Sequence, residues 1–397
     1  MRQPCSALLG LAAAILCLAP AAARLPAGQA PPARIVAIGD IHGAADQFVG
    51  ILQAAGLADA AGKWTGGTAT FVQTGDYLDR GAAAIQVLDL LMALEGQVKQ
   101  AGGRAEILMG NHEVMNMLHE FTDVSPEAYA RFADNKSDDR RRKAYDDSQA
   151  ALKRAGGSED ESGSKEAWLA AHPPGYVEYV DAMGPKGKYG KWLRARKAIV
   201  QVDTTVFMHA GLSPATQGAV DDVNREVARA IRAWDDSCDQ LVQERLITPY
   251  SSVKQIVAAA AYDLQKISKS VEAGQPLDAR VTREYVDQLK SIALIGDGPL
   301  LAAQGPMWFR GLSQTPTEET DEQVTALLSR LGAKRMVVGH TPRLPGRITP
   351  RFDNRVIPID TGMLSTFFKG GRASALEIAG DKVTAIYVGE REVLVDK

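Results

Sequence analysis

The chain has 397 residues, of which 45% are hydrophobic and 23% are charged. This composition indicates a globular protein that can bury one large core or two smaller ones. The formal net charge of −3 gives no general attraction to nucleic acid or to an anionic membrane, so neither is expected as a partner.

The N-terminus has the pattern of a secretory signal peptide. Arg2 supplies a slight positive charge, an apolar stretch follows at residues 8–18, and small alanines stand at 21–23. The apolar stretch is shorter than the roughly 20 residues that span a bilayer, which argues against an uncleaved anchor. We expect residues 1–24 to be removed and the mature protein to be periplasmic or secreted, with no membrane attachment.

The cysteines agree with this interpretation. Cys5 and Cys17 would leave with the signal peptide, so only Cys238 would remain and no intramolecular disulfide could form. Attachment of a lipid at Cys17 is disfavoured because the bulky Leu16 precedes it. Cys238 lies in the acidic segment AWDDSCDQL, where a thiolate is disfavoured, so we expect a structural role for it.

Six apolar, β-branched runs in the mature chain end in polar motifs. They are RIVAIGD, ATFVQTGD, AEILMGNH, TVFMHAG, RMVVGHT and VIPIDTG. Continuous apolar runs of this length predict strands buried on both faces. Helical periodicity at about 44–55 and 83–100 separates the first three runs, which is the alternation of βαβ units.

The C-terminal region has a different pattern. SALEIAG and VTAIYVGE flank Asp381 and Lys382, which predicts an antiparallel hairpin with this dipeptide as its turn. We therefore expect an α/β fold with mixed strand directions and two sheets packed together.

Two long segments interrupt the predicted core, at about 121–191 and 214–305. Both are helix-prone and neither contains a motif. They would form either a helical cap that selects substrates or inert surface structure, and we favour the cap because insertions commonly carry specificity. The basic run at 140–143 is expected to be a solvated face.

The strand-end motifs supply six candidate metal ligands, and these residues would hold two ions that share one carboxylate. The candidates are Asp40, His42, Asp76, Asn111, His209 and His340. Ligands gather at the carboxyl ends of strands in such sheets, and Asp76 has two oxygens with which to bridge. The mixture of imidazole and carboxylate favours manganese, iron or zinc over calcium or magnesium alone.

Each motif also has a plain structural interpretation. Asp40 alone would serve equally well as a helix cap, and His119, in a predicted helix, and His172 are expected to be packing or surface residues. It is the joint occurrence of four histidines in strand-end motifs that favours the metal centre.

The remaining motif residues predict chemistry at phosphorus. Two adjacent ions would activate a bridging water for in-line attack. Arg80 and Arg310, together with Asn111, would bind the phosphate oxygens. His112 would protonate the departing oxygen as general acid, with Asp79 orienting it and keeping it cationic, whereas Glu113 would support the loop. Either arginine would otherwise be an ion-pair partner.

These segments resemble a known family. GDIHG, GDYLDRG and GNHE are similar to the three signature motifs of metallophosphoesterases of the calcineurin-like superfamily, and the DRG at 79–81 is similar to that of the phosphoprotein phosphatase group. The resemblance covers about 35–116 and the patches around His209, Arg310 and His340. It implies a β-sandwich flanked by helices at 34–397, and it implies the same ligand, acid and phosphate-binding roles for the residues proposed above.

Within that group, WFRG, VVGHT, the insertions and the signal peptide resemble bacterial Shewanella-like phosphatases. HAG at 209–211 replaces the HGG of eukaryotic Ser/Thr phosphatases, and IDTGM stands where their SAPNY loop is expected. We therefore expect a two-metal phosphomonoesterase acting on phosphoprotein or a small phosphomonoester, with Ser/Thr or Tyr preference open. The alternatives are a dinucleotide polyphosphate hydrolase and a non-catalytic module that binds phosphorylated ligands.

Overall fold

The computed structural model describes residues 34–157 and 164–396. The predicted signal peptide, residues 1–24, lies outside the described residues. Within the described ranges, no helix combines the length and the apolar character needed to cross a bilayer.

A six-stranded sheet forms one half of the fold, and its centre is built from the N-terminal strands. The order is β10-β9-β8-β1-β2-β3, with β1, β2 and β3 parallel and the other neighbours antiparallel. The strands are β1 (Arg34–Ile38), β2 (Thr70–Gln73), β3 (Arg104–Ile107), β8 (Ser374–Ala379), β9 (Lys382–Tyr387) and β10 (Glu390–Val395).

A four-stranded sheet forms the other half, in the order β4-β5-β6-β7. Its strands are β4 (Ile199–Val202), β5 (Thr205–Met208), β6 (Arg335–Val338) and β7 (Val356–Pro358). β4 and β5 are antiparallel, whereas β5, β6 and β7 are parallel. Both sheets therefore contain a set of three parallel strands whose carboxyl ends can carry ligands.

Alternating side chains of β1 show how the layers pack. Ile35 and Ala37 belong to an apolar cluster with Val337 and Ile357 of the second sheet, whereas Val36 packs with the helices. Successive strand residues point to opposite faces, so one strand serves both layers. Each β1 residue from Ile35 to Ile38 is buried, as its continuous apolar sequence predicts.

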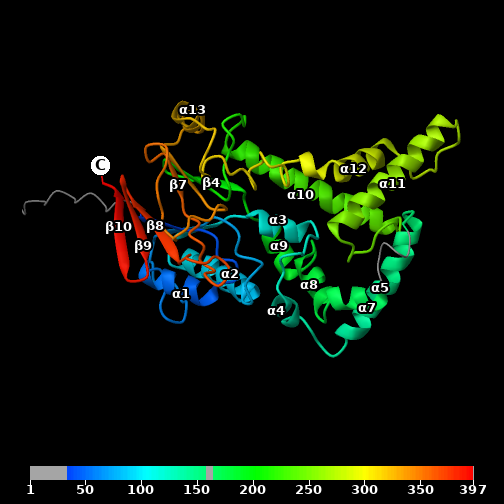
Figure 1. The fold of residues 1–397 in the computed structure, drawn as a ribbon, viewed down its shortest axis with the longest axis horizontal. Helices are drawn as coiled ribbons and strands as arrows, with labels where there is room; N and C mark the ends of the chain where they lie inside the picture. The colour runs from blue at the N-terminus through cyan, green and yellow to red at the C-terminus, as the bar shows by residue number, and fades with distance from the viewer. Residues whose placement is uncertain (1–33, 158–163, 397) are drawn as a thin grey trace, which may run out of the picture. The chain divides into compact units, whose positions relative to one another are not determined.

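Helices cover the outer face of each sheet. α1 (Ala45–Ala54) and α2 (Ala84–Gln100) pack on the six-stranded sheet, and α13 (Asp321–Leu331) packs on the other. Figure 1 shows α1 and α2 beside the first sheet and α13 beside the second. The result is an αββα sandwich, which confirms the predicted fold class, and α1 and α2 agree with the predicted ranges to within one residue.

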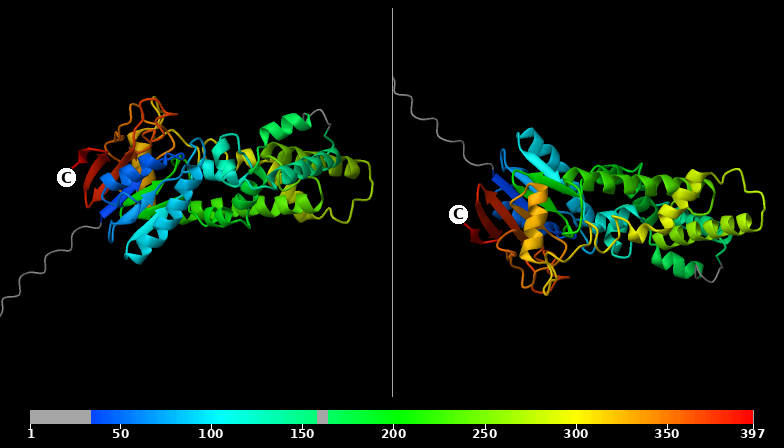
Figure 2. Two further views of the ribbon diagram at one scale, coloured as in Figure 1. Left: turned by 90° about the horizontal axis from the view of Figure 1, so that it is seen from below. Right: turned by 90° about the horizontal axis from the view of Figure 1, so that it is seen from above.

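The two insertions are helical, as predicted, and their helices lie together to one side of the sheets (Figures 1 and 2). The first contains α4 (Pro126–Ala130), α5 (Ser137–Arg154), α7 (Lys165–Ala171), α8 (Tyr176–Met183) and α9 (Lys188–Arg194). The second contains α10 (Val220–Gln243), α11 (Val253–Glu272), α12 (Arg283–Ala293) and the short 3₁₀ turn η1 (Ile295–Asp297). Whether they act as a cap stays a prediction.

Two local predictions differ from the structure, and one strand was not predicted. The turn between β8 and β9 is Gly380–Asp381, one residue earlier than predicted, because Ala379 pairs with Lys382 and Gly380 takes the positive φ of 63° that the turn requires. A further strand, β10, was not anticipated. His119 lies outside a helix, because α3 (Asn111–Met117) ends before it and His119 has a φ of 63°.

Candidate active site

The six proposed ligands lie at the carboxyl ends of parallel strands from both sheets. Asp40 and His42 follow β1, Asp76 follows β2, and Asn111 follows β3 after three connecting residues. From the second sheet, His209 follows β5 and His340 follows β6. All six are buried, with exposed fractions of 0 to 5%.

The backbone at the site is held in an unusual conformation. His42, Asp76, Asp79, Arg80 and His340 all have φ between 47° and 67°, a region that costs energy for residues other than glycine. Such strain persists only where the surrounding structure enforces it, and it gathers at functional sites. The two carboxylates, two imidazoles and one guanidinium are therefore aimed by the fold.

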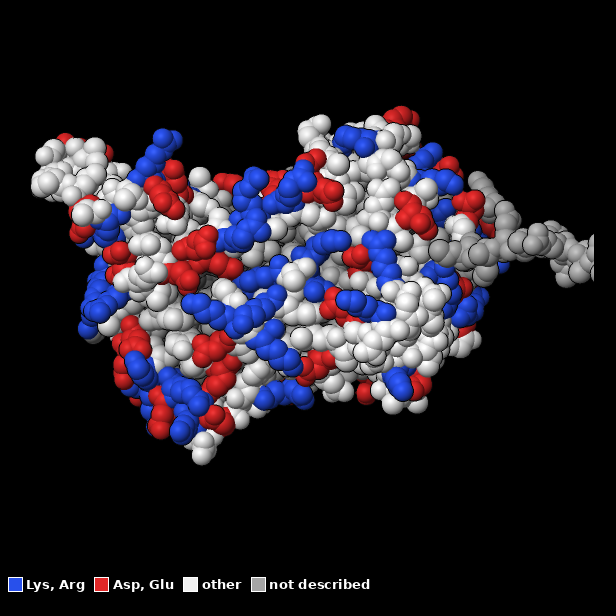
Figure 3. Space-filling view, turned by 180° about the vertical axis from the view of Figure 1, so that it is seen from behind, with Lys and Arg blue, Asp and Glu red and all other residues white. Residues whose placement is uncertain are grey.

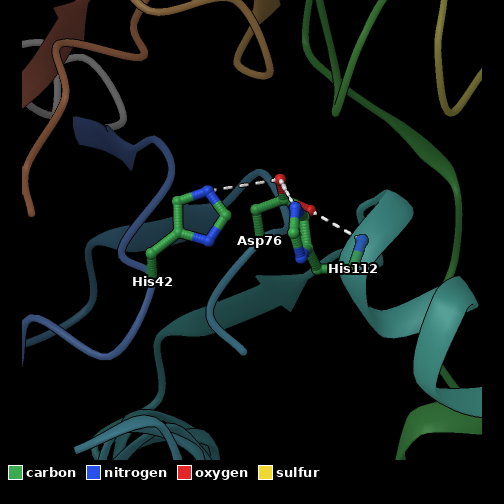
Figure 4. A group of neighbouring side chains, drawn as sticks. All are labelled: His42, Asp76 and His112. Carbon is green, nitrogen blue, oxygen red and sulfur yellow. Dashed lines mark hydrogen bonds and ion pairs between the residues drawn. The ribbon is translucent and has the colours of Figure 1, made fainter. Parts of the chain in front are cut away.

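The first group of possible metal ligands is His42, Asp76 and His112, drawn in Figure 4. His42 Nε2 lies 3.5 Å from Asp76 Oδ2 and 4.0 Å from Asp40 Oδ2. The Nδ1–H of His42 donates to the Leu78 carbonyl (3.1 Å), so Nε2 carries the lone pair. The NH1 group of Arg80 donates to that nitrogen (2.9 Å), which shows that a positive charge is accommodated there.

The second group is Asp76, His209 and His340. The Nδ1–H of His209 donates to the Thr74 carbonyl (3.0 Å), and its Nε2 lies 2.8 Å from Asn111 Oδ1 and 3.3 Å from Asp76 Oδ1. His340 Nδ1 lies 3.1 Å from the same nitrogen, and His340 Nε2 is buried without a hydrogen-bond partner.

This crowding of electron-rich atoms fits bound cations. Four atoms that can ligate a metal, His209 Nε2, Asn111 Oδ1, Asp76 Oδ1 and His340 Nδ1, converge here. Such an arrangement is costly in a buried site unless a positive charge is present. Asp76 belongs to both groups, as expected for a shared carboxylate. Asp40 accepts the backbone N–H of His340 at 3.0 and 3.1 Å, which ties the ends of the two sheets together.

The pKa values of the site residues follow from burial and charge. Burial lowers the pKa of His42 to about 3 and that of His340 to about 2, so both imidazoles are neutral, as metal ligation requires. Burial would raise the pKa of Asp76, but the neighbouring His209 and His112 hold it well below its usual range. Asp76 is therefore ionised.

His112 has the opposite electrostatic setting. Burial would lower the pKa of His112, but Asp76 and the hydrogen-bonded Asp79 raise it to about 9. Its Nδ1–H donates to Asp79 Oδ2 (2.8 Å), which leaves Nε2 facing the cavity. Although His112 is close enough to Asp76 to belong to a metal group, this pairing keeps it cationic and suits it to donate a proton.

A cavity of about 230 Å³ opens at the metal groups, and the predicted residues His112, Arg80 and Arg310 line it, whereas Asp79 does not. It is formed by Asp76, Arg80, Asn111, His112, Met115, Asp123, Trp308, Arg310, His340, Pro342 and Phe368. The two arginines thus face one cavity, as predicted. Arg310 is positioned by donating from NH1 to the His340 carbonyl (2.8 Å).

Glu113 supports the site by accepting backbone hydrogen bonds. Its carboxylate accepts the N–H groups of Asp76, Tyr77, Leu78 and Gly110 at 2.7 to 3.0 Å, and the residue is fully buried. This geometry agrees with the predicted supporting role and explains how the strained turn at Asp76 is held.

We expect Glu113→Gln to destabilise the protein strongly. The amide NH₂ would face N–H donors, and the lost charge-assisted bonds would lower the free energy of unfolding by roughly 2 to 4 kcal/mol. Urea unfolding measures the change, with the exposed Glu226→Gln on α10 as control. An unfolding midpoint equal to that of the wild type would contradict the supporting role.

Several residues that contact the site were not predicted from the sequence. Asn116 donates a hydrogen bond to Asp79, the partner of His112, and Tyr179 in turn donates to Asn116. Asp123, in the first insertion, faces His112, and its Oδ2 lies 3.9 Å from His112 Nε2. Asp360 follows β7 and is buried, which raises its pKa to about 6. The strand-end rule could have found Asp360, and the (i, i+4) spacing from His112 could have found Asn116.

Comparison with known sequences identifies the family. The family profile described as calcineurin-like phosphoesterase matches residues 33–344. The chain belongs to this family and is a metal-dependent phosphoesterase, a hydrolase that acts on phosphoric ester bonds. The predicted family and enzyme class are thereby confirmed.

Individual sequences and one solved structure are similar to this chain. An uncharacterized protein of Schizosaccharomyces pombe is 26% identical over 90% of this chain and 82% of its own length. Shewanella-like protein phosphatase 2 of Arabidopsis thaliana is 40% identical, but over only 25% of this chain and 26% of its own length. Among solved structures, a cold-active protein-tyrosine phosphatase of a psychrophilic Shewanella species has the same fold, with a TM-score of 0.57 and 22% identity over 91% of this chain and 80% of its own.

Proposed function

We propose that this protein is a two-metal phosphomonoesterase that dephosphorylates proteins, with phosphotyrosine as the favoured residue. Two observations together carry the proposal. Asp76 belongs to both groups of possible metal ligands, and His112, Arg80 and Arg310 line the same cavity. A site of this kind combines charge neutralisation, phosphate binding and proton donation within one small volume.

The ligand set for two divalent ions would be Asp40, His42, Asp76, Asn111, His209 and His340. The mixture of imidazole, carboxylate and amide donors suits manganese, iron or zinc. Such ions, when bound, would neutralise phosphate oxygens and lower the pKa of a nearby water molecule.

The residues of this chain would perform the remaining tasks. Arg80 and Arg310 would hold the non-bridging phosphate oxygens with planar N–H donors, and Asn111 would add an N–H donor beside them. His112 would give the proton on Nε2 to the oxygen of the leaving group while Nδ1 keeps its bond to Asp79. Because the charges on the face drawn in Figure 3 are mixed in sign, local groups of this kind are a better basis for phosphate affinity than an extended basic surface.

An aromatic rim supports the preference for phosphotyrosine. Phe367 is 59% exposed, its ring contacts Phe368 at 4.9 Å between centroids, and the Arg80 guanidinium lies 5.0 Å from its centre. Phe368 lines the phosphate cavity. An exposed phenyl ring beside a phosphate-binding arginine offers a stacking surface for an aryl leaving group. The name of the Shewanella relative, a protein-tyrosine phosphatase, points the same way.

Phe367→Ala tests this rim. We expect the KM for a phosphotyrosine peptide to rise roughly fivefold, because a stacking contact contributes about 1 kcal/mol. The KM for the matching phosphoserine peptide and the inhibition constant of inorganic phosphate should stay unchanged. Leu294→Ala, which truncates an exposed apolar side chain of the second insertion, is the control. Equal loss on both peptides would contradict the rim's role in selectivity.

The function itself is tested by a substrate profile of the protein lacking residues 1–24. The protein is stripped with EDTA, reloaded separately with manganese, iron or zinc, and assayed on phosphopeptides, p-nitrophenyl phosphate and diadenosine tetraphosphate. We expect metal-restored activity on the monoesters. Activity confined to diadenosine tetraphosphate would establish the alternative hydrolase, which the HAG segment suggests, and tight phosphopeptide binding without turnover would indicate a binding module.

We also propose that the protein is exported and that residues 1–24 are its signal peptide. The charged, apolar and small-residue segments of the N-terminus support this. The protein recovered from the periplasm or medium should have an N-terminal sequence that begins near Leu25, and an intact Met1 in an internal fraction would contradict export.

A further inference from the structure

We infer that Tyr179, on α8 of the first insertion, is a positioning residue for the general acid. It would act through Asn116, which holds Asp79 against His112. The inference rests on the proposed function, because it assumes that His112 donates the proton to the leaving group. It gives the insertion a specific part in the reaction, at a residue that does not line the cavity.

An unbroken chain of hydrogen bonds joins the four residues. The Tyr179 hydroxyl donates to Asn116 Oδ1 (2.5 Å). Asn116 Nδ2 donates to both oxygens of Asp79 (2.9 and 3.0 Å), and Asp79 Oδ2 accepts the Nδ1–H of His112 (2.8 Å). All four residues are buried, with exposed fractions of 1 to 2%, so water cannot replace a lost bond at low cost.

The chemistry of the side chains determines which group donates and which accepts in each of these hydrogen bonds. The carboxylate of Asp79 only accepts hydrogen bonds, so Asn116 must present its NH₂ group to Asp79 and its oxygen to Tyr179. Asn116 Nδ2 also donates to the His112 carbonyl (2.9 Å), which fixes the amide to the helix that carries the acid. Removing the tyrosine hydroxyl leaves Asn116 Oδ1 without its donor, so only the Nδ2 bonds then hold the amide against Asp79.

Aromatic packing holds Tyr179 in place. Its ring makes edge contacts with Phe121, Tyr129 and Phe132, at 5.9, 5.1 and 5.5 Å between centroids. These rings precede α5 in the same insertion, and edge-to-face contacts of this kind favour one ring orientation. The hydroxyl is therefore presented to Asn116 by a rigid cluster, as a positioning role requires.

The dependence of the rate on the leaving group distinguishes positioning from a general structural role. A good leaving group such as p-nitrophenolate departs with little help from an acid, whereas phenolate needs more. A misaligned His112 would therefore slow phenyl phosphate more than p-nitrophenyl phosphate, whereas general damage to the site would slow both equally.

The test is Tyr179→Phe in the metal-loaded, full mature chain. We expect kcat for phenyl phosphate to fall roughly tenfold, the equivalent of one hydrogen bond, with less than a twofold fall for p-nitrophenyl phosphate and no change in KM for either. Tyr129→Phe is the matched control, because it removes a hydroxyl from the same cluster without removing the donor to Asn116; it should leave both rates unchanged. Equal losses on both substrates, or none, would overturn the inference.

Two further measurements complete the test. Asn116→Ala should show the same selective loss, and adding Tyr179→Phe to it should cause little more, because both act through one chain; additive losses would overturn the inference. The ¹H NMR signal of the His112 Nδ1 proton can be identified by its absence in His112→Ala. This signal should broaden or move upfield in Tyr179→Phe, and an unchanged signal would overturn the inference. Because the NMR measurement needs no turnover, it tests the inference separately from the proposed function. Inactivity of the wild type on every monoester would instead refute the proposed function.

Discussion

Asp76→Asn should remove bound metal and activity together. The substitution keeps the size of the side chain but removes the charge that both ligand groups share. Without it, His42 and His209 each lose a carboxylate neighbour, at 3.5 and 3.3 Å. We expect kcat to fall roughly a thousandfold, the equivalent of about 4 kcal/mol of transition-state stabilisation by metal ions.

Metal analysis beside the activity assay decides the outcome. Asp381→Asn, in the exposed turn between β8 and β9, changes charge by the same amount and should retain both metal and activity. An Asp76→Asn protein that binds two ions per chain with wild-type turnover would show that the carboxylate is not shared between them.

His112→Ala should lower kcat by about two or more orders of magnitude while metal content is retained. The reason is the loss of the proton that His112 would deliver, which typically contributes about 10² to 10⁴ in rate. The loss should be greatest for substrates with poor leaving groups. Asp79→Asn should have a similar but smaller effect, because it removes the partner that orients the ring.

This variant also separates two roles that the geometry brings close together. His112 Nε2 lies 3.8 Å from Asp76 Oδ2, near enough for His112 to belong to a metal group with His42. Loss of an ion in His112→Ala would assign His112 as a ligand and remove the acid role. His172→Ala, in the insertion, should change neither metal content nor rate.

The core of the site was predictable because it follows a geometric rule. Parallel strands end at one edge of a sheet, so residues such as Asp40 and Asp76 must meet there once their strands are identified. The apolar runs identified β1 and β2 with little ambiguity, because strands buried on both faces have continuous apolar sequences. His209 and His340 follow the same rule in the second sheet.

The surroundings of the site were less predictable, because they depend on tertiary packing. Tyr179 lies 63 positions from its partner Asn116, and no periodicity or motif links them. Phe367 stands in a turn outside any strand or helix, where no periodicity predicts the position of its side chain. His119 was predicted to lie in a helix, yet α3 ends before it and its ring Nδ1 hydrogen-bonds to the distant Ser251 carbonyl, which is a tertiary contact.

The most direct test is an anomalous-scattering crystal structure of the metal-loaded protein, combined with a metal count per chain. The two ligand groups predict two ions, one near His42 and one near His209 and His340, with the Asp76 carboxylate between them. A single ion, or a pair in which either ion does not contact Asp76, would contradict the shared-carboxylate centre on which the account depends.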